Sequence, residues 1–213
     1  MNAASLPSGG LYLLTPDDPD TDRLLRRVEQ GLRGGARLLQ YRNKTAPPAL
    51  RRAQALALKR LCDDAGVPLI VNDDVALAEA VGAAGVHLGA EDGGIAAARA
   101  RLGESAIVGA SCYADPARAR AAAEAGASYL AFGAFHSSGT KPLAVRAEPA
   151  ILAACAGLGL PRVAIGGITP DNARPLVEAG ADFLAVIDGV FGAPDPTAAA
   201  RAISALFPPP ARG

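Results

Sequence analysis

Short apolar runs and longer amphipathic stretches alternate along the whole chain. The apolar runs are rich in Val, Ile and Leu, which is typical of strands buried on both faces of a parallel sheet. The stretches between them repeat apolar residues at helical spacing. Eight strands are predicted, over residues 11–14, 38–41, 69–72, 85–88, 107–111, 129–132, 162–165 and 183–187. Helices are predicted after them, over residues 21–33, 48–65, 75–81, 95–102, 116–125, 149–156, 171–179 and 197–206.

Glycine and proline punctuate this alternation. Pro48 stands at the start of a predicted helix, and Gly66, Gly126 and Gly180 stand where helices end before the next strand. Eight βα units without a strand-only region favour a single (β/α)8 TIM barrel over an open doubly wound sheet. We expect the barrel over residues 11–207, an N-terminal tail over 1–10 and a disordered tail over 208–213.

The third apolar run ends abruptly in Asn72, Asp73 and Asp74. Polar groups at the C-terminal end of a barrel strand face the mouth of the active site. A carboxylate there suits a hard cation such as Mg²⁺, which prefers oxygen ligands and keeps several waters. Asp74 is expected to cap the helix that begins near Val75. For Asp73, capping and metal binding both stay open at this point.

Cationic residues follow the second strand. Arg42 and Lys44 are two residues apart and share a direction in extended chain, and Gln40 precedes them. Arg as a planar fork and Lys as a compact charge could together hold a diphosphate. The alternative is a pair of solvated surface charges.

Polar residues also follow the fourth and fifth strands. Asp92 lies beyond the strand end next to that of Asp73, so the two carboxylates can share one metal ion. His87 is expected to be a packed or hydrogen-bonded barrel residue, because Mg²⁺ avoids imidazole. Ser111 could cap the helix at Pro116, although its distance from that helix weakens this interpretation.

Two later loops suit anions. The sixth strand is followed by hydroxyls, a glycine and a cation between Ser137 and Lys141. The seventh is followed by Gly166 and Gly167, and barrels often bind phosphate after strands seven and eight. Plain turns would look similar. Two anion sites beside a metal site imply two phosphorylated substrates, or one with a phosphate at each end.

Composition excludes several classes of partner. Half of the 213 residues are hydrophobic, and 21 Lys and Arg balance 21 Asp and Glu, so no global field attracts nucleic acid or an anionic membrane. Trp is absent and aromatics are scarce, which argues against a base-stacking surface. The three cysteines have no metal spacing and indicate a reducing, cytoplasmic compartment. Neither a signal peptide in residues 1–10 nor an apolar segment of membrane-spanning length is expected.

Several segments together resemble thiamine phosphate synthase, over residues 11–207. The resemblance is carried by the order and spacing of residues 40–44, 71–73, 85–89 with Glu91 and Asp92, 109–111, 133–141 and 163–168. This family joins hydroxymethylpyrimidine diphosphate to a carboxylated thiazole phosphate, giving thiamine phosphate, diphosphate and CO₂. The resemblance therefore implies small-molecule substrates and Mg²⁺ as cofactor.

The resemblance also implies roles for individual residues. Pyrimidine diphosphate is expected to bind to Gln40, Tyr41, Arg42, Asn43, Lys44, Asn72, Ser111 and Lys141. Mg²⁺ is expected to bind to Asp73 and Asp92. Thiazole phosphate is expected to bind to Ser138, Gly139, Thr140, Gly167, Ile187 and Asp188. Arg42, Lys44, Ser111 and Lys141 are expected to act in catalysis.

The chain departs from the family pattern at three positions. His136 and Ser137 stand where an aromatic or aliphatic residue and a proline are usual, and Asp188 stands where serine is usual. Asp188 puts a carboxylate near an expected phosphate. Two alternatives stay open: a thiazole tautomerase, which would not need the diphosphate cluster, and a non-catalytic sensor of thiamine intermediates. A homo-oligomer is compatible with the sequence.

Overall fold

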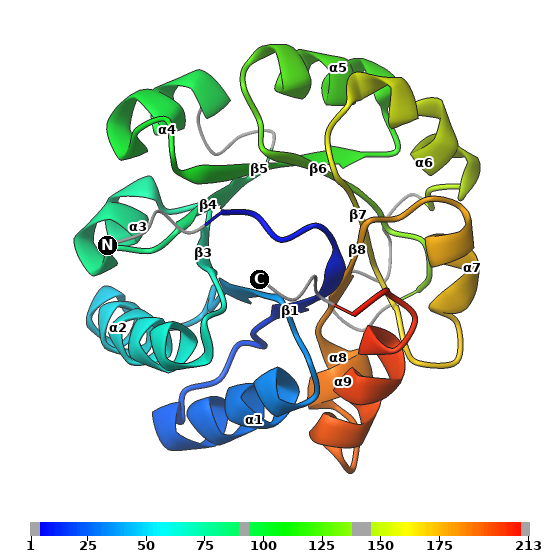
Figure 1. The fold of residues 1–213 in the computed structure, drawn as a ribbon. Coiled ribbons are helices and arrows are strands. Elements are labelled where there is room, and N and C mark those ends of the chain that lie inside the picture. The colour runs from blue at the N-terminus through cyan, green and yellow to red at the C-terminus, as the bar shows by residue number, and fades with distance from the viewer. Residues whose placement is uncertain (1–4, 90–93, 138–145, 210–213) are drawn as a thin grey trace.

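Eight parallel strands follow one another in chain order around a closed barrel, with helices outside it (Figure 1). This is seen in a computed structural model that describes residues 5–89, 94–137 and 146–209. The strands are β1 (Gly10–Leu14), β2 (Leu38–Tyr41), β3 (Leu69–Asn72), β4 (Gly85–Leu88), β5 (Ile107–Tyr113), β6 (Tyr129–Gly133), β7 (Arg162–Ile165) and β8 (Phe183–Val186). The predicted (β/α)8 barrel is confirmed.

The helices begin and end largely where local signals predict. They are α1 (Thr21–Arg33), α2 (Pro48–Ala65), α3 (Val75–Val81), α4 (Ile95–Leu102), α5 (Pro116–Glu124), α6 (Ala150–Ala154), α7 (Arg174–Glu178), α8 (Asp188–Phe191) and α9 (Pro196–Ser204). Aspartates cap four of them, namely Asp20, Asp74, Asp115 and Asp195. The predicted cap by Asp74 is therefore confirmed.

Two apolar layers result from the alternation of side chains along each strand. Leu11 and Leu13 of β1 belong to the outer layer, between the sheet and the helices. Tyr12 and Leu14 of the same strand belong to the inner layer, inside the barrel, where Tyr129 and Phe183 are also fully buried. The interior is thus a packed core, as in other barrels of this size.

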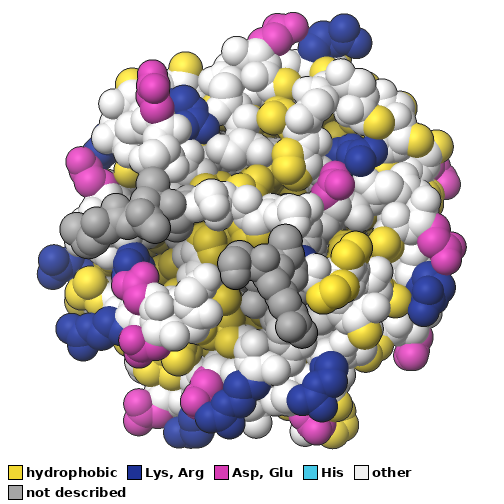
Figure 2. All heavy atoms as spheres, in the orientation of Figure 1, with side chains coloured by type: hydrophobic (Ala, Val, Ile, Leu, Met, Phe, Trp, Pro, Cys, Tyr) yellow, Lys and Arg dark blue, Asp and Glu magenta, His cyan; other side chains and the backbone are white. Residues whose placement is uncertain are grey.

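Both ends of the described chain meet at the barrel. Leu6 packs against the inner layer, and Figure 1 shows this N-terminal segment crossing the barrel opening. Arg37 donates to the carbonyl oxygens of Gly9 at 2.9 Å and Pro208 at 2.5 Å. On this face most charged side chains lie around the periphery (Figure 2). Within the described ranges, no helix is long and apolar enough to cross a bilayer.

Some predicted boundaries differ from the structure. Strand β5 continues to Tyr113, past a register shift against β6 between Ser111 and Tyr113. Helix α6 is shorter than predicted and is followed by a 3-10 turn over Ala156–Leu158, because this stretch is glycine-rich and closes on Gly159 in the left-handed region.

Two boundaries near the strand ends of β7 and β8 also differ. The prediction started a helix at residue 171, but the side chain of Asn172 bonds the backbone of Thr169 and Gly167 and holds a turn there. Helix α7 therefore begins only at Arg174. The short helix α8 was not predicted, because its 4 residues are too few to show a helical period.

Candidate active site

A large cavity opens where the barrel strands end. Its volume is about 860 Å³, within the range of small-molecule sites. Polar residues on its wall come from the ends of different strands. They include Gln40, Arg42, Lys44, Asn72, Asp73, His87, Ser111, Thr169 and Asp188. Because the carboxyl ends of parallel strands meet at one end of a barrel, residues far apart in the sequence converge here.

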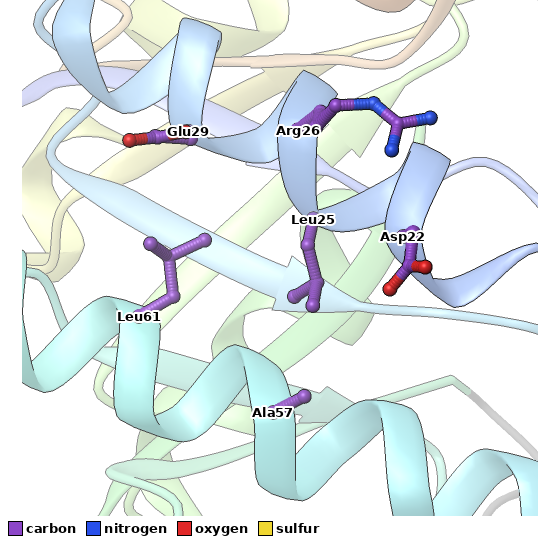
Figure 3. A pocket seen from close by; sticks show the side chains of 6 residues that line it. All are labelled: Asp22, Leu25, Arg26, Glu29, Ala57 and Leu61. Atoms are coloured by element: carbon purple, nitrogen blue, oxygen red, sulfur yellow. The ribbon is translucent and has the colours of Figure 1, made fainter.

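A second hollow lies elsewhere on the surface, between α1 and α2 (Figure 3). Its volume is about 270 Å³, and Leu25 and Leu61 face each other across it. The lining residues are Asp22, Leu25, Arg26, Glu29, Ala57 and Leu61. It is a gap between two packed helices that shares no lining residue with the larger cavity, whose polar wall is the candidate site.

The cationic cluster after β2 is held in place by residues that follow β1. Arg42 Nη1 donates to Asp17 Oδ1 at 2.8 Å, and the backbone N–H of Lys44 donates to the same oxygen at 3.0 Å. The buried hydroxyl of Thr15 bonds both the N–H and the carbonyl of Arg42, each at 2.8 Å. Arg42 is thus fixed at both its backbone and its guanidinium.

Asp73 has a left-handed backbone, with φ 62°. A non-glycine residue in this region is uncommon and indicates a locally constrained site. Its N–H donates to the carbonyl of His87 at 2.8 Å, which ties the end of β3 to that of β4. Its Oδ2 accepts from Asn72 Nδ2 at 2.5 Å and lies 3.4 Å from Lys44 Nζ. The carboxylate is therefore oriented on the cavity wall.

This carboxylate fits a hard cation. Mg²⁺ usually binds through one or two carboxylates and completes its shell with waters and substrate phosphates. The described ranges contain no group of three His, Cys, Asp or Glu side chains arranged to hold a metal ion. Asp92, the second predicted ligand, lies outside the described residues. The donors that are described suit a site completed by substrate oxygens.

Five side chains form a hydrogen-bonded row through the barrel interior. Its members, in order, are Gln40, Tyr12, Tyr129, His87 and Ser111. His87 is bonded through both ring nitrogens, as expected for a barrel histidine rather than a metal ligand. Ser111 does not cap α5, since Asp115 does so. Burial raises the pKa of both Tyr12 and Tyr129, so both phenols stay protonated.

Two loops form the opposite wall of the cavity, after β7 and after β8. Gly167 packs so closely against Ser137 and His136 that a Cβ would overlap their backbone. Gly189 packs equally closely against the carbonyl of Ile168. The two glycine-containing loops are therefore joined to each other and to the segment after β6.

Asp188 lies at the cavity mouth as the first residue of α8, and its side chain is exposed. Ile187 occupies the N-cap position of this helix, and no side-chain cap bond is made there. The structure therefore shows no side-chain cap at the start of α8. The carboxylate of Asp188 borders the cavity instead.

Some predicted site residues are not on the cavity wall. Tyr41 points outward, where its hydroxyl donates to Gln54 Oε1 at 2.8 Å. Asn43 donates to the same oxygen at 3.1 Å and to the carbonyl of Asp18 at 3.0 Å. Any contact of these two residues with substrate would involve their backbone. Ser138, Gly139, Thr140 and Lys141 lie outside the described residues.

Sequence reasoning missed the residues that support the site. The sequence pattern predicts Tyr12 and Tyr129 only as strand residues, and it places Thr15 and Asp17 in a loop. The available signal for Tyr12 and Tyr129 was a hydroxyl at a position facing the barrel interior, where a buried phenol needs a partner. For Asp17 there was none, because its partners follow a different strand.

The chain is similar to proteins of one family over most of its length. The family described as thiamine monophosphate synthase matches residues 11–190. Thiamine-phosphate synthase of Xanthomonas campestris pv. campestris (strain 8004) is 59% identical over 198 residues, covering 93% of this chain and 95% of the relative. The thiamine-phosphate synthase of Azoarcus sp. (strain BH72) is 58% identical over 199 residues, covering 93% and 97%.

Solved structures are similar to the chain as well. Thiamine phosphate pyrophosphorylase from Pyrococcus furiosus is 33% identical, with a TM-score of 0.83, and the match covers 93% of this chain and 95% of that one. A 3-hexulose-6-phosphate synthase, 18% identical with a TM-score of 0.71 over 93% of this chain and 100% of its own, shares the fold alone.

Proposed function

The chain belongs to the thiamine monophosphate synthase family, and we propose that it joins its two substrates in the cavity at the strand ends. It is a thiamine-phosphate synthase, a transferase acting on small molecules, as its relatives indicate. The observation that carries the proposed site is the convergence of Arg42, Lys44 and Asp73 on one wall and of two glycine loops on the opposite wall of the same cavity.

The two walls suit two different phosphates. Hydroxymethylpyrimidine diphosphate would bind with its diphosphate at Arg42 and Lys44 and its ring toward Gln40, Asn72 and Ser111. Lys141 would join these cations. The phosphate of the thiazole would bind at Gly167, Ile187 and Asp188, with residues 138–140 beside it. This assignment is supported by the frequent binding of phosphate after strands seven and eight of barrels.

Asp73 and Asp92 would hold Mg²⁺ beside the diphosphate. When bound, the ion supplies positive charge against the negative charge of the departing group. Asn72 and Lys44 orient the Asp73 carboxylate through the contacts described above. The left-handed backbone of Asp73 turns its side chain toward the cavity just as β3 ends.

The proposed reaction begins with cleavage of the C–O bond between the pyrimidine methylene and the diphosphate. The bonding electron pair leaves with the diphosphate oxygen, and the methylene cation is stabilised by the ring's amino group. Arg42, Lys44 and Lys141 stabilise the charge that builds on the leaving group. The lone pair of the thiazole nitrogen then forms the new C–N bond, and a carboxylated thiazole loses CO₂.

No protein nucleophile is needed in this scheme. The barrel contributes position, because both substrates are held in one cavity, and a fixed electrostatic environment. Among the described residues the cavity wall carries the groups needed for ion pairing and hydrogen bonding. The scheme is therefore a dissociative substitution promoted by electrostatics.

Two other functions are separated from this one by a single experiment. A thiazole tautomerase would not need Arg42 and Lys44 in the cavity, and a sensor would bind without turnover. The purified chain is incubated with both substrates and Mg²⁺. Equal amounts of thiamine phosphate and diphosphate support the synthase. Isomerised thiazole without diphosphate would indicate the tautomerase, and bound but unchanged substrates would indicate the sensor.

We also propose that the enzyme works in the cytoplasm. All three cysteines are free and buried, which suits a reducing compartment. Burial raises the pKa of Cys62 and of Cys112 to about 12, so neither is poised as a redox-active thiolate.

A further inference from the structure

The row of hydrogen bonds through the barrel has a cavity-lining side chain at each end. Gln40 Nε2 lies 2.6 Å from the Tyr12 hydroxyl, which lies 2.8 Å from the Tyr129 hydroxyl. That hydroxyl lies 2.9 Å from His87 Nδ1, and His87 Nε2 lies 2.9 Å from Ser111 Oγ. Gln40 and Ser111 both line the cavity. The middle of the row therefore connects two groups of the proposed pyrimidine site.

Counting protons along the row gives it a direction. Each phenol has one proton to donate. Because Gln40 donates to Tyr12, the Tyr12 proton goes to its other partner, Tyr129. The Tyr129 proton then goes to Nδ1 of His87. A neutral His87 that accepts at Nδ1 carries its proton on Nε2 and donates it to Ser111. The proton of Ser111 is then directed away from the row, toward the cavity.

The direction can reverse only as a whole. If the Gln40 amide turned over, its oxygen would accept from Tyr12, and every later bond would have to invert. Ser111 would then donate to His87 and offer only an acceptor to the cavity. The row thus couples the two ends: Gln40 offers its carbonyl while Ser111 offers its hydroxyl proton, or the reverse.

Packing leaves the hydroxyls in the middle of the row with little freedom. Tyr12 and Tyr129 are 1% and 0% exposed. Their rings meet edge to face at 5.8 Å, and His87 stacks on Tyr129 at 5.6 Å. Gly109 makes room for the Tyr129 phenol, since a Cβ there would overlap its ring. A buried hydroxyl without a partner is costly, so the bonds of the row depend on one another.

We propose that Tyr12 and Tyr129 are positioning residues that make Gln40 a hydrogen-bond acceptor and Ser111 a donor toward the pyrimidine substrate. This inference rests on the proposed function of the cavity. The complementary ligand donates at one end and accepts at the other, as an aminopyrimidine ring does: its amino group donates, and its unprotonated ring nitrogens only accept. An analogue with an oxo group in place of the amino group would meet the Gln40 carbonyl with a second acceptor.

The first test interrupts the row without changing its shape. Tyr129→Phe removes the acceptor of the Tyr12 proton, so the Gln40 amide is expected to turn over and present its NH₂ group to the substrate. Tyr12→Phe leaves the Gln40 amide without its anchor. In each variant KM for pyrimidine diphosphate should rise about tenfold, the loss of roughly one hydrogen bond. KM for thiazole phosphate should change less than about twofold, because Gln40 and Ser111 face the other substrate.

The double variant tests whether the row acts as a unit. Tyr12→Phe with Tyr129→Phe should raise KM no more than the stronger single change, because the row is already broken by one. Ser128→Ala is the matched control, since Ser128 directly precedes Tyr129 but its hydroxyl accepts from Val108 N and Arg99 Nη2 and takes no part in the row. The inference would be overturned if the rises in KM of the two single variants multiplied in the double variant. It would also be overturned if KM rose equally for both substrates.

The second test needs no turnover. The chain has only two histidines, so ¹H–¹⁵N long-range spectra of the wild-type protein, assigned with His136→Gln, report the ring protons of His87. A neutral ring protonated at Nε2 is expected. A ring protonated at Nδ1 would reverse the row and refute the proposal, even if the enzyme is active. An inactive wild-type chain with the expected ring would instead contradict the proposed function alone.

Discussion

The ammonium of Lys44 lies 3.4 Å from Oδ2 of Asp73, so a predicted diphosphate ligand and a predicted metal ligand contact each other. Lys44 is half exposed, and exposed ion pairs of this kind contribute little to stability. Either partner can therefore exchange the other for a ligand at low cost. A divalent cation at Asp73 and a diphosphate at Lys44 would each replace one half of the pair, which makes their binding mutually favourable.

Activity should require a divalent metal ion. Chelation is expected to abolish formation of thiamine phosphate, and added Mg²⁺ to restore it, because Asp73 presents its carboxylate to the cavity. Asp73→Asn should raise the Mg²⁺ concentration needed for half-maximal rate. Asp63→Asn, which removes an exposed carboxylate paired with Lys59 on α2, is the control. Full activity in excess chelator would remove the metal from the scheme.

Lys141→Ala should slow the chemical step. The loss of one strong electrostatic donor to a developing charge costs about 2 to 4 kcal/mol of transition-state stabilisation. The loss should appear mainly in kcat, because the charge grows as the bond to diphosphate breaks. Lys59→Ala changes a lysine of α2 and is the matched control. Unchanged kcat and kcat/KM in the Lys141 variant would exclude this role.

Asp188→Ser should strengthen binding of thiazole phosphate. At about 4 Å two unit charges interact by about 1 kcal/mol in water and about 4 kcal/mol at an effective dielectric of about 20. Because Asp188 is exposed at the cavity mouth, the lower figure applies, and KM should fall about fivefold. KM for pyrimidine diphosphate should change little.

Steady-state kinetics with each substrate varied in turn measures this effect. Asp171→Ser is the control, since Asp171 is exposed and outside the cavity wall. An unchanged or higher KM for thiazole phosphate in Asp188→Ser would show that the carboxylate does not repel the substrate.

The cysteines should resist modification by thiol reagents in the folded protein. Burial raises the pKa of Cys62 and Cys112 to about 12 and also raises that of Cys155. At pH 8 these groups are thiols, and only the thiolate is nucleophilic. Ellman's reagent should therefore react slowly with the native chain. In guanidinium, which unfolds the chain, it should react rapidly with all 3 thiols. Rapid reaction of one thiol under native conditions would show that its region opens readily.

Asp18 should stabilise the fold at neutral pH and lose this effect in acid. The hydrogen bond from Arg23 is the main cause that lowers the pKa of Asp18 below its ordinary value of 3.8. The unfolded chain therefore takes up the proton first. The contribution is complete above pH 3.8 and disappears as the pH falls through the pKa of the folded state.

Urea unfolding of the wild type and of Asp18→Asn across this range measures the contribution. The free energies of unfolding should differ most at neutral pH and converge below pH 3.8. Equal free energies of unfolding at neutral pH would mean that the backbone contacts of Asp18 with Asn43 and Gln54, which the variant keeps, rather than its charge, hold this region.

Local patterns in the sequence determined much of this protein. Apolar runs with flanking glycines predict the strands, and a carboxylate before a helical stretch predicts a cap, as Asp74 shows. These features depend on neighbours within a few residues, so they can be recognised in a single sequence. The barrel then follows from eight repeated units, and with it the convergence of Arg42, Asp73 and Ser111 at one end.

The tertiary structure decided which side chains meet. Tyr12 and Tyr129 are 117 residues apart and share a hydrogen bond, while Tyr41, beside Gln40 and Arg42 in the sequence, faces Gln54 outside the barrel. Alternation along a strand divides residues between two faces, but partners across the interior depend on barrel closure and register. Asp17 reaches Arg42 for the same reason, because neighbouring strand ends are close in space and distant in the chain.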